Sequence, residues 1–109
     1  MFDLTPVLDQ LSVPGNFDIA VPEYFNFGVD VIDARAAEGD KTAYIWVDRS
    51  GSVVEHHSFS DLSQASTRFA NVLHQIGARK GDCAVVIMPR VPAWYEVVIG
   101  CIKAGVVAM

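Results

Sequence analysis

The first clear hydrophobic periodicity along the chain runs from Tyr24 to Ala37 and predicts a helix. Asn26 can act as its N-cap, and Gly39 lies where a left-handed residue would end it. Apolar side chains recur at intervals of three and four residues, which predicts one buried face. That face consists of Phe25, Val29, Ile32 and Ala36, and it is widened by Phe27, Val31 and Ala34.

Two short β-branched and aromatic stretches follow, and together they predict a β-hairpin over residues 42–58. The first stretch is TAYIWV, residues 42–47. The second stretch alternates, so that Glu55 and His57 point to one face while His56 points to the other. Gly51 suits a positive backbone φ in the turn between them.

The strongest helical pattern begins at Ser60, which we expect to be the N-cap, with Asp61 facing the positive end of the helix dipole. Gly77 is expected to end this helix. Its predicted core face consists of Leu62, Ala65, Phe69, Leu73 and Ile76.

Residues 83–109 predict a strand, a helix and a second strand. The run CAVVIM, residues 83–88, lacks polar alternation, as a strand covered on both faces does. Pro92 suits a first helical position and Gly105 suits a C-cap, after which residues 106–109 begin another strand. Strands joined in this way should lie parallel. The predicted fold class is therefore α/β, with a β-hairpin plus a βαβ unit, flanking helices and an incomplete sheet.

The domain organisation follows from these elements. Residues 1–23 show weak periodicity and predict an N-terminal arm, with one helical turn at Val7, Leu8 and Leu11. Residues 24–109 are predicted to form the first part of a larger domain, truncated within its sheet. Hydrophobic residues make up 51% of the 109 positions, and the mean hydropathy is +0.29. Both values suit a piece of a larger core better than a small soluble domain.

Charge and targeting patterns narrow the function classes. The net charge of −5 comes from 8 basic and 13 acidic residues, and no basic patch supports nucleic-acid binding. Arg90, Glu96 and Lys103 interrupt the most apolar stretch, so no run approaches the ~20 apolar residues of a membrane span. No secretory or transit signal is visible, which favours a cytoplasmic location. Cys83 and Cys101 are expected to be small buried hydrophobes rather than a disulfide.

The histidines and cysteines do not predict a metal site or a nucleophile. His56 and His57 are adjacent in a strand, so they point to opposite faces and cannot chelate one ion together. His74 has no His or Cys three or four residues away. Cys83 has no base near it in the sequence, which favours a buried strand position over a catalytic role.

The remaining candidates also have structural explanations. Asp30 and Asp33 lie three apart on a helix, where they suit either a solvated face or a carboxylate pair. Arg79 and Lys80 beside Gly81 could touch a phosphate, although a plain surface turn is favoured and neither common phosphate-loop pattern occurs. The aromatic side chains could stack on a base but favour the core; they are Trp46, Phe59, Trp94 and Tyr95. We therefore predict no catalytic, cofactor-binding or metal-binding residue.

Residues 22–109 nevertheless resemble the N-terminal portion of the AMP-forming acyl-CoA synthetases, members of the adenylate-forming superfamily. The segment FSDLSQASTRFANVLHQIGARKGDCAVVIMPRVPAWY, residues 59–95, is similar to the first core region of the family. GCIKAGVVAM, residues 100–109, is similar to the segment before its P-G-T stretch. NFGVDVID and PRVPAWY are most similar to the medium-chain branch.

The resemblance implies a parent enzyme that uses a carboxylic acid, ATP, Mg²⁺ and CoA. The phosphate-binding loop, the acyl pocket and the C-terminal lysine of the family have no counterpart in residues 1–109, so no site residue is transferred. The implied role is a scaffold fragment, inactive alone, whose partner is the remainder of the parent domain. The resemblance to this family also implies the mitochondrial matrix as an alternative to the cytoplasmic location. A stand-alone binding or interaction module, a small nucleotide-binding α/β protein, and a short product with no independent role stay open.

Overall fold

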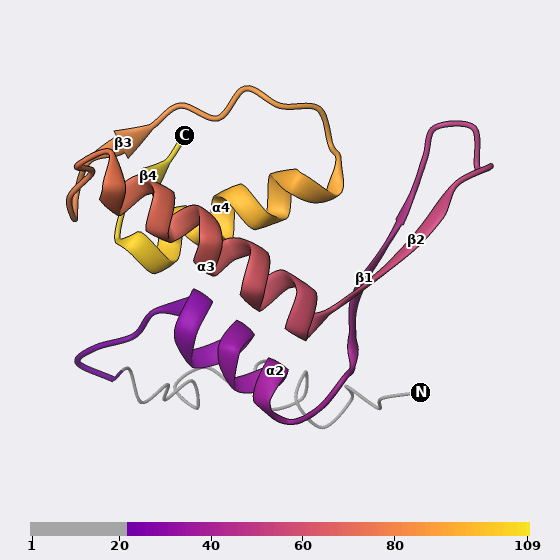
Figure 1. Ribbon diagram of the computed structural model, residues 1–109, viewed down its shortest axis with the longest axis horizontal. Coiled ribbons are helices and arrows are strands. Elements are labelled where there is room, and N and C mark those ends of the chain that lie inside the picture. The colour runs from indigo at the N-terminus through magenta and orange to yellow at the C-terminus, as the bar shows by residue number, and fades with distance from the viewer. Residues whose placement is uncertain (1–21) are drawn as a thin grey trace, which may run out of the picture.

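The computed structural model describes residues 22–109, so the predicted helical turn at Val7, Leu8 and Leu11 lies outside the described residues, as does the arm up to residue 21. Helices α3 and α4 pack side by side at the centre, the first helical segment lies beside them, and a hairpin projects at one end (Figure 1). In chain order the elements are η1 (Phe27–Asp33), α2 (Ala34–Ala37), β1 (Thr42–Val47), β2 (Val54–Ser58), α3 (Phe59–Gln75), β3 (Cys83–Ala84), α4 (Pro92–Ala104) and β4 (Val107–Ala108).

The main core forms where α3 packs on α4. Cys101 on α4 and Ser66 on α3 are both fully buried there, and the Ser66 hydroxyl donates to the Leu62 carbonyl at 2.6 Å, so this polar group is satisfied. Gly100 permits the close approach, because a Cβ at this position would lie 2.8 Å from the Ser66 carbonyl oxygen. The buried apolar members of this core are Ala70, Leu73, Cys101, Ala104 and Val106.

Helix α3 begins two residues earlier than the sequence suggested. Ser58 is the N-cap and forms a capping box with Asp61, so the expectation of a cap at Ser60 is wrong. The physical reason is that Ser58 keeps extended backbone angles, which lets its side chain reach the backbone N–H of Asp61. The helix ends before Gly77, which has a φ of 88° as predicted. Ile76, expected on the core face, is 74% exposed; it is the C-cap residue, one position past the end of α3.

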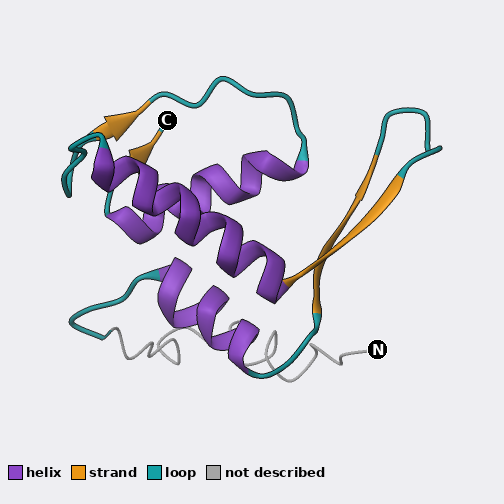
Figure 2. Ribbon diagram, viewed as in Figure 1, coloured by secondary structure: helices purple, strands orange, loops and turns teal. Residues whose placement is uncertain are grey.

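The predicted hairpin is confirmed. Strands β1 and β2 pair antiparallel, with Ile45 opposite His56 and an irregularity between Thr42 and Tyr44. Gly51 adopts a φ of 75° in the connecting turn, as the sequence predicted. Figure 2 shows this hairpin and the second strand pair at opposite ends of the helices, so the described strands form two separate sheets.

The strand–helix–strand unit is also confirmed, since β3 and β4 pair in parallel across α4. Pro92 is at the start of α4, and Gly105 caps its end with a φ of 71°. However, the prediction of a strand over residues 83–88 covered on both faces is wrong. The strand β3 is short, and Val85 and Ile87 are 69% and 90% exposed.

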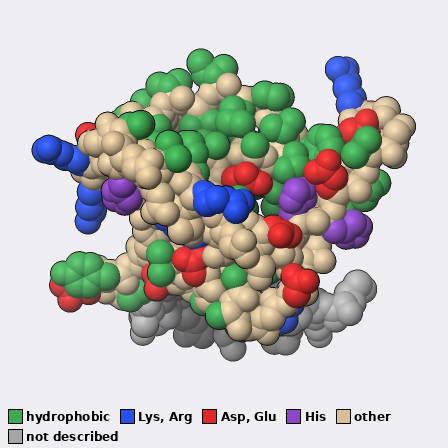
Figure 3. Space-filling model, viewed as in Figure 1, with side chains coloured by type: hydrophobic (Ala, Val, Ile, Leu, Met, Phe, Trp, Pro, Cys, Tyr) green, Lys and Arg blue, Asp and Glu red, His purple; other side chains and the backbone are tan. Residues whose placement is uncertain are grey.

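The exposure of this segment follows from the two-residue period of extended chain. Ala84 packs against the core of α3 and α4, so its neighbours point the opposite way. No described element covers that opposite side. Figure 3 shows hydrophobic side chains gathered on this part of the surface. The exposed large apolar residues there are Val85, Ile87, Met88, Val107 and Met109.

The first helical segment begins at Phe27 rather than Tyr24, and its first seven residues have π-helical hydrogen bonding. Asn26 is its cap, as predicted, with its side chain accepting from the N–H of Gly28 at 3.0 Å. The predicted apolar face is mostly wrong, because Phe25, Phe27 and Val29 are exposed. Only Ile32 enters the core, and the face presented to α4 carries Gly28 instead. None of the helices in residues 22–109 is long and apolar enough to cross a membrane.

Candidate functional site

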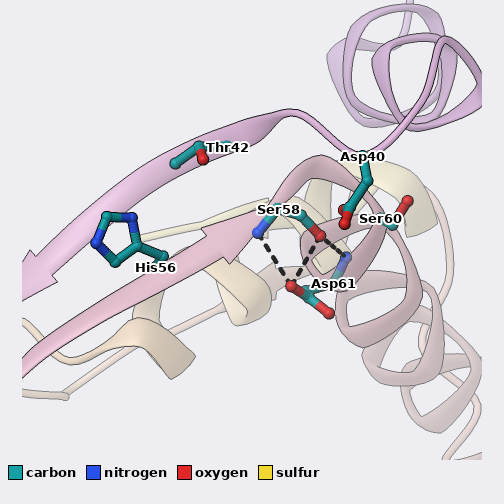
Figure 4. A pocket seen from close by; sticks show the side chains of 6 residues that line it. All are labelled: Asp40, Thr42, His56, Ser58, Ser60 and Asp61. Carbon is teal, nitrogen blue, oxygen red and sulfur yellow. Dashed lines mark hydrogen bonds between the residues drawn. The ribbon is translucent and has the colours of Figure 1, made fainter.

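A polar hollow of about 470 Å³ lies where the hairpin meets the start of α3 (Figure 4). The N-cap of α3 forms part of its wall. The Asp61 carboxylate accepts from the Ser58 backbone N–H at 3.0 Å and from the Ser58 hydroxyl at 2.8 Å. These bonds hold the pKa of Asp61 below its ordinary value. The hollow is lined by Asp40, Thr42, His56, Ser58, Ser60 and Asp61.

The side chains of this hollow do not converge on one point. In Figure 4 the imidazole of His56 stands along β2, away from the cluster formed by Asp40, Ser58 and Asp61. His57, the next residue, is half-buried on the other face, where its ring stacks on Tyr44 with centroids 4.7 Å apart. The two histidines are therefore separated as the strand period requires, and neither forms a nucleophile–base pair with a described side chain.

An aromatic row, defined as His57, Tyr44, Tyr95 and Trp94, joins the hairpin to α4. Tyr44 lies 4.8 Å from Tyr95, which meets Trp94 edge-on at 5.2 Å. Burial, followed by the negative charge of Glu96, raises the pKa of Tyr44 to about 12. Sequence reasoning did not single out Tyr44, although the hairpin register places it opposite His57.

Of the four aromatic side chains that the sequence favoured for the core, some pack in the interior and others lie at the surface. Phe59 packs against the small cluster around Ile32, Leu62 and Ile99, as expected. Trp46 is half-buried, and its indole N–H donates to the Arg90 carbonyl at 2.9 Å. Trp94 and Tyr95 line a second hollow of about 410 Å³ together with Met88 and Arg90.

The two carboxylates that the sequence placed three residues apart serve different partners. Asp30 accepts from the backbone N–H of Asn26 at 2.6 Å, which closes the start of η1. Asp33 forms an ion pair with Lys103 of α4 at 2.5 Å. They do not act as a carboxylate pair. Sequence reasoning missed the role of Lys103; its only signal was a cation within an apolar helix.

The turn at residues 79–82 has the geometry of a plain surface turn. The Arg79 backbone N–H donates to the Asp82 carboxylate at 2.8 Å, and Gly81 has a φ of 93°. The side chains of Arg79 and Lys80 are exposed. The turn therefore closes on its own aspartate, and its negative charge offsets the attraction of the two cations for a phosphate.

The thiols and histidines offer no metal donor set among the described residues. No group of three His, Cys, Asp or Glu side chains within residues 22–109 could hold an ion. Both cysteines are free, and burial raises the pKa of Cys101. Cys83 is exposed, so its expected burial is wrong, because only β4 pairs with β3 and no described element covers its outer side. His74 lies exposed on α3. The His, Cys, Asp and Glu side chains of residues 22–109 therefore form no donor set for Mg²⁺.

Comparison with known sequences identifies the family. The model of the AMP-binding enzyme family matches residues 32–109. The mitochondrial acyl-coenzyme A synthetase ACSM3 of Homo sapiens is 35% identical over 103 residues, which cover 88% of this chain and 17% of the relative. Mitochondrial ACSM1 of Mus musculus is 35% identical over 121 residues, covering 99% of this chain and 21% of the relative.

Solved structures agree with this assignment. An acyl-CoA synthetase of Brucella canis superimposes with a TM-score of 0.71, over 99% of this chain and 18% of that chain; at 22% identity it shows the shared fold alone. A fatty acyl-adenylate ligase of L. pneumophila, solved with acyl adenylate and pyrophosphate, has a TM-score of 0.65 and 26% identity, over 74% of this chain and 14% of that chain. The chain spans only a small, N-terminal part of these proteins. On this match of sequence and fold, the chain belongs to the AMP-binding enzyme family and is similar to its acyl-CoA synthetases.

Proposed function

We propose that this chain is a scaffold segment of an ATP-dependent carboxylic acid–CoA ligase. The observation that supports the proposal is the similarity to acyl-coenzyme A synthetases, for example 36% identity to ACSM3 of Pongo abelii over 88% of the chain. The packed pair α3–α4 and the parallel strands β3 and β4 would form part of the framework on which the substrate-binding segments of the enzyme are mounted. The medium-chain branch, which NFGVDVID and PRVPAWY resemble most, is the proposed branch for the parent enzyme.

The reaction proposed for the parent enzyme has two steps. A carboxylate oxygen attacks the α-phosphorus of ATP, forming an acyl-adenylate as pyrophosphate leaves. The thiol of CoA then attacks the acyl carbon, forming the thioester as AMP leaves. Mg²⁺ would stabilise the developing phosphate charge in the first step. Because residues 22–109 present no cluster of His, Cys, Asp or Glu that could hold Mg²⁺, we assign no chemical step to them.

The compartment is part of the same proposal. The similar synthetases are named as mitochondrial proteins, which favours the mitochondrial matrix over the cytoplasmic location expected from the sequence. Fractionation of cells that express the native protein, followed by protease protection, distinguishes the two compartments.

A segment exchange tests the scaffold role. Residues 22–109 would replace the corresponding segment of human ACSM3, and pyrophosphate release would be measured with ATP, CoA and a panel of medium-chain acids. We expect turnover by the chimera and none by the same enzyme lacking the segment. A soluble chimera that unfolds cooperatively but does not turn over would contradict the proposal.

The isolated chain supplies the complementary experiment. We expect no acid-dependent pyrophosphate release from it and no saturable binding of ATP in a calorimetric titration. Clear turnover would make the chain itself a catalyst. Saturable ATP binding without turnover would instead favour a small nucleotide-binding protein.

A further inference from the structure

The strap, defined as η1 with α2 (Phe27–Ala37), lies across helices α3 and α4 with little apolar contact. Only two of its residues, Gly28 and Ile32, are buried. Ile32 joins Leu62 and Ile99 in a small cluster. The larger core of α3 and α4 contains no strap residue. The larger core of the helix pair is therefore built without strap side chains, whereas the apolar attachment of the strap is Ile32 in the smaller cluster.

The second attachment of the strap is ionic. The side chain of Lys103 on α4 is only 6% exposed, and its ammonium donates to the Asp33 carboxylate of the strap at 2.5 Å. It also donates to the Ser63 carbonyl at 3.1 Å and to the Thr67 hydroxyl at 2.9 Å, both on α3. The Ser63 hydroxyl donates to the same Asp33 oxygen at 2.6 Å. One carboxylate and one ammonium thus connect all three helical segments.

The backbone of the strap lies over the side chain of Lys103, so the position of the strap determines whether the lysine ammonium reaches water. A Cβ at Gly28 would lie 2.5 Å from the Lys103 Cγ, so the strap backbone passes directly over the lysine stem. When the strap is docked, it keeps the ammonium from water, and a buried charge without its partner is strongly unfavourable. When the strap lifts, water can solvate the ammonium, and pairing with Asp33 is no longer required.

We propose that the Asp33–Lys103 pair is a clasp that selects between a docked and a lifted strap, with the helix pair α3–α4 remaining folded in both states. Lifting the strap would remove one wall of the hollow of about 620 Å³ that Phe27 of the strap lines together with Ile102 and Lys103 of α4. The clasp is thus a conformational device of this chain, and it does not depend on the proposed function.

Native-state hydrogen exchange, read by NMR on the 109-residue chain, tests the clasp. Lys103→Met keeps the length of the side chain and removes the charge, and Asp33→Asn keeps its shape and one acceptor oxygen. In both variants we expect the amides of residues 30–37 to exchange at least ~10-fold faster, while those of α4 keep their protection. The double variant should match Lys103→Met, because either change alone breaks the pair.

Arg35→Met provides the matched control. Arg35 lies on the same strap and forms an ion pair with Glu38 in which both side chains are about half exposed, so its loss should leave strap exchange unchanged. Equal acceleration in the strap and in α4 would overturn the proposal, because the pair would then support the whole fold. Unchanged strap exchange would overturn it as well. If Lys103→Met does not fold, the exchange rates of Asp33→Asn alone test the proposal. This variant is expected to fold, since the Asp33 side chain is partly exposed.

Discussion

Substitution of Gly100 by alanine tests whether the close approach of α3 and α4 is essential. In an isolated helix, this change would stabilise by about 1 kcal/mol, because glycine is the poorer helix former. In this fold the new Cβ would lie 2.8 Å from Phe69 Cδ1 and 2.8 Å from the Ser66 carbonyl oxygen. The carbonyl belongs to the backbone of α3 and cannot rotate away, so the helices must separate.

Overpacking of this kind costs about 1–3 kcal/mol. We place Gly100→Ala at the upper end of that range, because the Phe69 Cβ also lies within 3.0 Å of the new methyl group. After subtraction of the propensity gain, the expected net loss in the free energy of unfolding is about 1–2 kcal/mol.

Urea denaturation followed by far-UV circular dichroism measures this loss. Asn71→Ala, at an exposed position of α3, is the matched control and should stabilise slightly by propensity alone. A Gly100→Ala variant as stable as the wild-type chain, or more stable, would refute the reasoning, because it would show that the helices have room for the methyl group.

Two further results are expected. Ser58→Ala should lower the free energy of unfolding by about 1 kcal/mol through loss of the α3 cap, whereas Ser60→Ala should have little effect. If the same urea titration shows a larger loss for Ser60→Ala, Ser60 would be the cap, as the sequence suggested. Absorbance at 295 nm should show one tyrosine titrating near pH 12, and this phase should disappear in Tyr44→Phe. Because the folded-state pKa of Tyr44 lies above its ordinary value of 10.0, its contribution to stability is complete below pH 10 and is lost as the pH rises through 12. The free energy of unfolding should therefore fall between pH 10 and 12, and Tyr44→Phe should remove that part of the fall. A fall of the same size in Tyr44→Phe would contradict the assignment.

Local rules in the sequence determined the order and type of the elements. Gly51, Pro92 and Gly105 occupy the turn, helix-start and helix-end positions that their backbone preferences predict. The strand stretch TAYIWV became β1 with the bounds expected. The family was also readable from the order of these segments, and the match over residues 32–109 confirmed it. These features depend on neighbours within a few residues along the chain, which the sequence displays directly.

The tertiary structure decided which apolar side chains are buried and which charges are paired. Periodicity marked Phe25 and Val29 for the core, but both are exposed, because the strap turns the face with Gly28 toward α4. Lys103 and Asp33 lie 70 residues apart in the chain, and only the packing of three helical segments joins them. Local preference is set by the backbone of each residue, whereas burial and ion pairing depend on which surfaces meet, and that is determined when the segments pack together.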